Sequence, residues 1–280
     1  MQTRRKWPTL AIVSATIALV FAPVFIPHEV ARWYLAAAAN AFRLGNMAAA
    51  ADYMESAVAW DDDLAQDGLA MSLLLAEQYD FQNAIRAFKL TLGGNPPRSA
   101  NGLNQLAYYR ALAEIELAEA LADIDRAIEL EGPNPAMLDT KAWVLHALGR
   151  DLEALSFVNE AVGTFEEQLG NMGELGGATR EESSANDTGA DAANDVRETD
   201  QGNEAAQSES LQPTSMWPEL VEVRDRIEAA KRKLSPNVYS LAVMRFHRMR
   251  IYEAVGASAE ASLDRDWLRQ RDVPIVDQLF

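Results

Sequence analysis

The chain has 280 residues, a formal net charge of −17 and no cysteine. The lack of cysteine excludes disulfide bonds and removes the thiolates that serve as nucleophiles or metal ligands. The acidic balance opposes nucleic-acid binding, because a surface that binds phosphates needs an excess of Lys and Arg.

The first segment, residues 1–30, is predicted to anchor the chain in a membrane. Arg4, Arg5 and Lys6 precede an uncharged run over residues 7–27. About 20 apolar residues at a rise of 1.5 Å are enough to cross the hydrocarbon core. The positive cluster predicts a cytoplasmic N-terminus, with the rest of a single-pass protein outside the cytoplasm, in the periplasm or cell envelope.

A cleaved signal peptide is the alternative interpretation of this segment. Val20 and Ala22 are small enough for a cleavage site, although Pro23 would follow it directly and the apolar run exceeds the usual length. Cleavage would release a soluble protein, whereas an intact segment would be a transmembrane helix.

Small residues recur at a fixed interval through residues 31–170, each about one turn into a predicted helix. The recurring alanines, spaced by 34, 36 and 34 residues, are Ala50, Ala84, Ala120 and Ala154. Seven residues after each of them stands Ala57, Thr91, Ala127 or Ala161. Such a period is typical of stacked helix pairs, because one pair cannot bury its own apolar face. The sequence therefore predicts an all-α fold.

The clearest version of this pattern, PAMLDTKAWVLHALGRDLEALSFVNEAV, resembles a tetratricopeptide repeat. Leu148 and Gly149 would close its first helix, and Ala154, Val158 and Ala161 would face inward from the second. The resemblance extends over four units and one partial unit: 31–64, 65–98, 101–134, 135–168 and 237–270. It implies a right-handed superhelical solenoid of helix-turn-helix repeats. An unrelated Ala-rich helical bundle is the alternative.

Two positions depart from the family pattern. Gly68 replaces the usual bulky aromatic residue in the second unit, and Glu114-Ile115 replaces the Leu-Gly turn in the third. The conformation of that third turn is therefore open.

An acidic insert and a final helical segment are predicted to follow the repeats. Residues 171–213 are rich in Gly, Ser, Asn, Asp and Glu, and have too few large apolar residues to support a core. We expect a disordered loop, which serves as a tether or is a tolerated insertion. Residues 214–280 are predicted to be helices that complete the solenoid, and their basic groups to form intramolecular pairs rather than a nucleic-acid site.

The sequence carries no pattern of residues that indicates catalysis, a cofactor, a metal or a small-molecule substrate. His28, His146 and His247 lie in three separate segments, and no phosphate-binding glycine loop is present. The acidic run over residues 61–63 lacks the remaining ligands of a calcium loop. We therefore expect a protein that is not an enzyme.

The family resemblance implies a protein-binding groove lined by the first helices of successive units. The matching positions are Arg32, Phe42, Arg43, Gln66, Glu77, Gln105, Tyr109, Asp139, Trp143, His146, Phe246 and Arg250. Aromatic residues supply much of the energy of interfaces, so Tyr109, Trp143 and Phe246 are the predicted anchors, unless they pack in the core. The expected function is a membrane-anchored scaffold that binds a protein or peptide. The alternative is a secreted or periplasmic chaperone or assembly factor.

Overall fold

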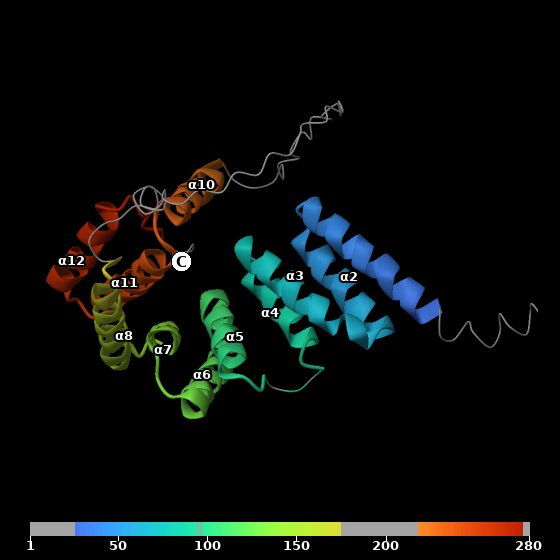
Figure 1. Cartoon of the computed structure of the whole chain (residues 1–280), viewed down its shortest axis with the longest axis horizontal. Coiled ribbons are helices and arrows are strands. Elements are labelled where there is room, and N and C mark those ends of the chain that lie inside the picture. The colour runs from blue at the N-terminus through green and yellow to red at the C-terminus, as the bar shows by residue number, and fades with distance from the viewer. Residues whose placement is uncertain (1–25, 94, 96, 175–217, 277–280) are drawn as a thin grey trace, which may run out of the picture. The chain divides into compact units, whose positions relative to one another are not determined.

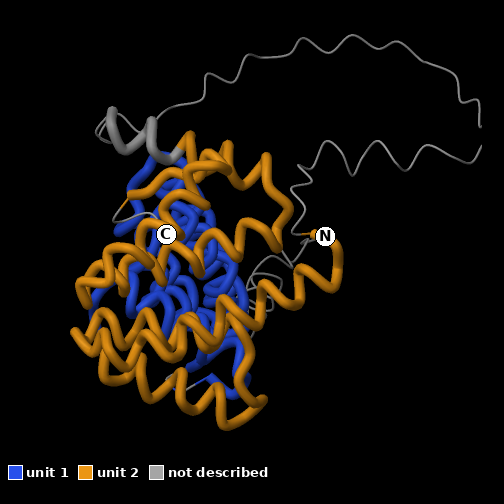
Figure 2. The backbone as a smooth tube through the Cα atoms, turned by 90° about the vertical axis from the view of Figure 1, so that its left-hand side faces the viewer, with its two compact units in different colours: residues 1–115 blue, residues 116–280 orange. Residues whose placement is uncertain are grey.

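The structure is a computed structural model that describes residues 26–93, 95, 97–174 and 218–276, and over these ranges it is helical without a strand (Figure 1). The all-α prediction is confirmed. The chain divides into two compact units, Met1–Ile115 and Glu116–Phe280, which Figure 2 colours separately.

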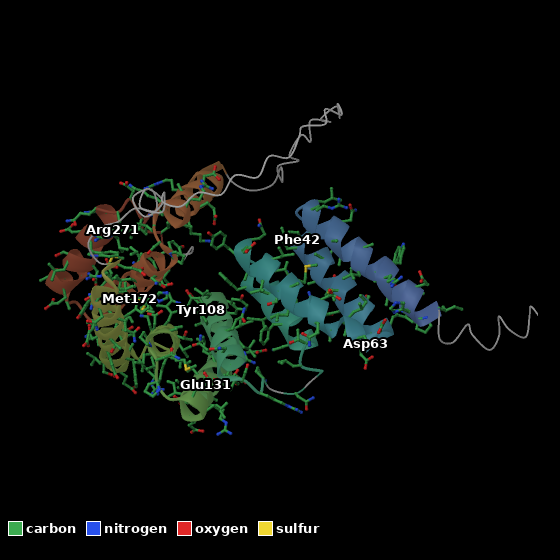
Figure 3. The ribbon with its side chains drawn as sticks, viewed as in Figure 1. Phe42, Asp63, Tyr108, Glu131, Met172 and Arg271 are labelled. Atoms are coloured by element: carbon green, nitrogen blue, oxygen red, sulfur yellow. The ribbon has the colours of Figure 1, made fainter. Side chains whose placement is uncertain are left out.

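The first unit contains a helix over residues 26–43, followed by helices that alternate with short turns. These are α2 (Met47–Trp60), the 3₁₀ turn η1 (Asp62–Leu64), α3 (Ala65–Glu77), α4 (Phe81–Leu90) and α5 (Ala100–Ala113). Helix α4 packs against α2, α3 and α5. A shared core gathers side chains from all five helices, and Phe42, labelled in Figure 3, packs on its edge.

The second unit contains helices from both sides of the acidic insert. These are α6 (Leu117–Glu131), α7 (Pro135–Ala147), α8 (Asp151–Met172), α10 (Pro218–Lys233), α11 (Pro236–Ala254) and α12 (Ser258–Arg269). Helix α7 packs against α6 and α8, and α11 packs against α7, α8 and α12. Helix α11 therefore continues the stacking of the α7–α8 pair, although more than 60 residues separate it from α8 in the sequence.

The recurring alanines explain how closely the helices approach. The fourth residue of α2, α4, α6, α8 and α12 is Ala50, Ala84, Ala120, Ala154 or Ala261, and none has exposed surface. Ala57, Ala127 and Ala161 are also fully buried, whereas Thr91 caps the shorter helix α4 and is half-buried. A side chain of one methyl group at these points lets two helix backbones approach closely.

Left-handed backbone ends the first helix of each pair at a regular position. Gly149 has φ of 72° five residues before Ala154, and Tyr79 has φ of 61° at the same position before Ala84. Between α5 and α6 this role falls to Glu114 and Glu116, with φ of 54° and 48°. The turn of the third repeat, between α5 and α6, therefore forms without glycine. Each left-handed residue there costs about 1–2 kcal/mol of strain.

Gly68 has a packing reason of its own. A Cβ atom at this position would lie 2.9 Å from the main-chain oxygen of Ala87 and 3.3 Å from the Cβ of Leu90. Helices α3 and α4 thus cross too closely for the aromatic residue of the family pattern. The departure reflects a tighter contact within this pair.

A buried ionic cluster links α11 and α12, the last helix pair of the second unit, to each other. Asp264 of α12 is only 1% exposed and accepts hydrogen bonds from Arg245 at 2.7 Å and from Arg248 at 2.7 and 2.8 Å. Arg245 also bonds Glu166 of α8. Burial of Arg248 lowers its pKa, whereas the hydrogen bond to Asp264 raises it. The net effect is a raised pKa for Arg248. The cluster therefore joins α8, α11 and α12.

The predicted anchor and insert fall mostly outside the described residues. No helix within the described ranges is both long and apolar enough to cross a membrane. Helix α8 extends to Met172, and the Glu174 carboxylate accepts hydrogen bonds from Ser235 and Asn237, so the first residues of the predicted insert belong to the folded unit. The rest of the insert, residues 175–213, lies outside the described residues.

Candidate interaction surface

Five of the predicted groove residues lie on α7 and α11. Asp139, Trp143 and His146 belong to α7, and Phe246 and Arg250 to α11. Both helices begin with a polar cap followed by proline, which fixes their start without the loss of a hydrogen bond. The cap side chains are Asn134, which accepts from the amide of Met137, and Ser235, which accepts from the amide of Val238.

Aromatic rings connect these two helices. The Trp143 ring stacks on the His247 ring with centroids 4.2 Å apart, and it lies 4.9 Å from His146 and 6.4 Å from Phe246. Phe246 is 1% exposed and Trp143 is half-buried. Trp143 is therefore the member of this cluster that both packs on α11 and offers surface to a partner.

A histidine–carboxylate pair lies beneath the tryptophan. His247 Nδ1 is 2.9 and 3.1 Å from the two carboxylate oxygens of Asp139, and an ionised carboxylate can only accept, so Nδ1 carries the hydrogen. His247 has no exposed surface and Asp139 has 6%. A base without exposed surface cannot reach the proton of a bound substrate in this conformation. The pair positions α7 against α11.

Two predicted groove residues meet within the first unit. Gln105 donates a hydrogen bond of 2.9 Å to the Tyr109 hydroxyl, and both lie on α5. Burial raises the pKa of Tyr109, and the charge of Glu77 on α3 adds to this effect. Tyr109 is 7% exposed and its ring packs 6.0 Å from that of Phe81. Tyr109 is thus mainly a core side chain, with Glu77 exposed nearby.

The remaining predicted residues of the first unit do not form a cluster. Arg32 lies 3.8 Å from Glu29 on its own helix, and Arg43 donates to Asn40 at 3.3 Å. Gln66 is exposed on α3. These side chains provide polar surface without a shared partner.

His247 is the residue in this region that sequence reasoning missed. It stands 14 residues before Ala261, and the corresponding positions before Ala120 and Ala154 hold Leu106 and Thr140, which are also buried. Ala36 and Ala70, at the corresponding positions before Ala50 and Ala84, are exposed, so the repeat register alone does not predict its burial. Spacing between histidines, which suits metal sites, gave no indication of it.

The acidic run forms a compact turn at the end of α2. The carboxylates of Asp61, Asp62 and Asp63 lie within 4.8 Å of one another, and Asp62 and Asp63 are exposed. The Asp61 carboxylate is 2.5 Å from His28 Nδ1, and this bond is the main reason why the pKa of Asp61 is lowered. The turn ties the helix over residues 26–43 to α2.

Comparison with known proteins gives no match, either to the models of protein families or to curated protein sequences.

Proposed function

We propose that the helix pairs are tetratricopeptide-like repeats of a membrane-anchored scaffold that binds a protein or peptide and carries out no catalysis. The observation that carries this proposal is the buried alanine at the fourth residue of five helices. It is supported by the left-handed residue five positions before four of these alanines, which is Gly45, Tyr79, Gly149 or Gly256. An Ala-rich bundle without a repeat has no reason to keep both features in one register.

The proposed binding surface is the face formed by the first helices within each unit. In the second unit the centre of this surface is Trp143, because its side chain is half-buried and its ring stacks on that of His247. A rigid aromatic side chain binds with little loss of conformational freedom. In the first unit the surface is mixed, with the polar Gln66 and Glu77 and the apolar Leu73 exposed on α3.

Site-specific photocrosslinking in the native membrane tests this proposal. Gln66 on α3 and Gln82 on α4 are both exposed glutamines, one on a first helix and the other on a second helix. A photoreactive residue at position 66 should give an adduct of defined mass, and the same residue at 82 should not. An adduct at 82 alone would move the binding surface to the second helices.

The N-terminus needs a separate measurement. Mass spectrometry of the natural protein should find residues 7–27 intact if the chain is anchored. A mature N-terminus near Pro23 would instead support the released periplasmic chaperone or assembly factor.

A further inference from the structure

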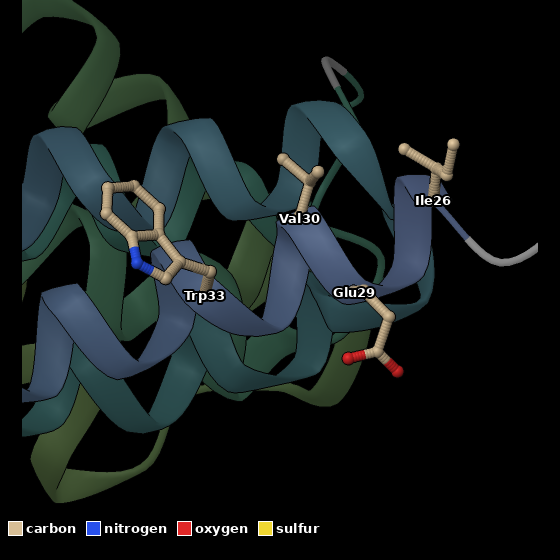
Figure 4. A pocket seen from close by; sticks show the side chains of 4 residues that line it. All are labelled: Ile26, Glu29, Val30 and Trp33. Carbon is tan, nitrogen blue, oxygen red and sulfur yellow. The ribbon is translucent and has the colours of Figure 1, made fainter.

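The helix over residues 26–43 exposes an apolar stripe. Ile26 and Trp33 are 54% and 63% exposed, and Val30, half-buried, lies between them at helical spacing. Figure 4 shows the three apolar side chains projecting from the helix, and Glu29, whose carboxylate is directed away from them, borders this stripe next to Trp33. Together the four residues line a shallow, open hollow. Three apolar side chains in contact with water carry an unfavourable hydration free energy.

The repeat register shows that this side of the helix is a packing face. Trp33 stands 17 residues before Ala50, and the same position before Ala120, Ala154 and Ala261 holds Leu103, Met137 and Met244. These three are 3%, 1% and 5% exposed, because a preceding second helix covers them. In α3 the position holds Asp67, which is exposed. Trp33 is therefore an apolar residue at a stacking position that no described helix covers.

The stripe cannot turn inward, because the opposite face of the helix is fixed. Ala31 and Ala38 have no exposed surface, and Ala38 belongs to the core of the first unit. At the start of the helix, His28 bonds Asp61 at the end of α2. The orientation of the stripe is thus set by packing and by one polar contact.

We propose that Ile26, Val30 and Trp33 lie in the headgroup boundary of a bilayer, so that the lipid surface covers the packing face of the first helix. This inference rests on the proposed anchor. The uncharged run over residues 7–27 ends one residue after Ile26, so the stripe begins where the anchor would leave the hydrocarbon. Trp33 lies about 10 Å further along the helix axis, at 1.5 Å per residue. A helix inclined to the membrane plane keeps that length within the interfacial layer.

Residue type and charge favour a zwitterionic lipid surface. Tryptophan prefers the headgroup level, where its ring is partly apolar and its N–H meets water. Glu29 and Arg32, both on one flank of the stripe, have opposite charges and lie 3.8 Å apart. The nearest excess charge is the acidic turn at residues 61–63, which would be repelled by anionic headgroups. The chemistry therefore suits a neutral surface such as phosphatidylcholine.

The chain has no cysteine, so single cysteines can be introduced for spin labelling without further changes. We suggest Trp33→Cys for the stripe and Arg32→Cys as the matched control, since Arg32 is exposed at almost the same height but 100° around the helix. The full-length chain would be placed in phosphatidylcholine liposomes. Ala37→Cys, on the same side as the stripe, gives a second reading if Trp33→Cys folds poorly.

Electron paramagnetic resonance then compares accessibility to oxygen, which concentrates in lipid, and to a water-soluble nickel chelate. A label at position 33 should be several-fold more accessible to oxygen than to the chelate. A label at position 32 should be more accessible to the chelate. If the protein floats with the liposomes but position 33 is accessible to the chelate, this inference is wrong and the proposed anchor still stands. Failure to float contradicts both. Dipolar broadening between labels at 33 would show that a second copy covers the stripe instead, which also overturns it.

Discussion

Replacing Asp264 by Asn should destabilise the second unit by about 3 kcal/mol. Asp264 is 1% exposed and accepts three hydrogen bonds from Arg245 and Arg248, which are 15% and 17% exposed. Removing one member of a buried ion cluster typically costs about 3–5 kcal/mol, because the partner charge stays buried. Arg245 keeps its bond to Glu166, so the lower end of that range applies. The variant retains size and shape, so the loss reports the charge and the acceptor oxygen rather than packing.

The assay is urea and thermal denaturation followed by circular dichroism. A loss of this size lowers the midpoint by about 6–12 °C for a unit of this length. The control is Asp266→Asn, two residues away on α12, because Asp266 is 65% exposed and lies 3.8 Å from the equally exposed Arg269. That pair contributes less than about 1 kcal/mol. Equal stability of the two variants would refute the role assigned to the cluster. Hydrogen exchange of α12 should locate the difference.

Three further predictions follow from the repeat register and the turns. Ala154→Phe should overpack the contact between α7 and α8 and lower the free energy of unfolding by about 1–3 kcal/mol, measured by urea denaturation. Glu114→Gly should raise stability by up to about 1 kcal/mol in the same assay, because glycine adopts the left-handed conformation without strain. Asp61→Asn should destabilise the protein near pH 5, and the difference should shrink as the pH falls below 3.8, since the bond from His28 lowers the pKa of Asp61. A carboxyl group with a lowered pKa in the folded state stabilises above its ordinary value of 3.8 and loses that contribution as the pH falls.

The periodic alanines allowed the helix pairs to be predicted, because their size is a direct requirement of close packing. Each of the predicted positions 50, 84, 120 and 154 is fully buried, and Ala261 extends the series. The turn at Glu114 could not be predicted in the same way. Its left-handed backbone depends on the packing of α5 and α6 in their own units and contradicts the local preference of glutamate.

The exposure of the predicted anchor residues could not be predicted from the sequence for a related reason. Leu73, Tyr109 and Trp143 each stand 11 residues before a recurring alanine, and therefore share one register position. Leu73 is 46% exposed, whereas Tyr109 is 7% exposed because Phe81 packs beside it. The register fixes the side of the helix on which a residue lies. Its burial depends on the neighbouring side chains, which differ between units.

The positions at which this chain departs from its own repeat are those that give each helix pair an individual role. His247 is buried and pairs with Asp139, so it makes the contact between α7 and α11 specific rather than merely apolar. Trp33 has the opposite character, because an apolar residue is exposed at a position that is covered in α5, α7 and α11. A buried polar group needs its partner within the fold, and an exposed apolar group is best satisfied by a partner outside it. The same register thus separates a contact that fixes the fold from a surface available for binding.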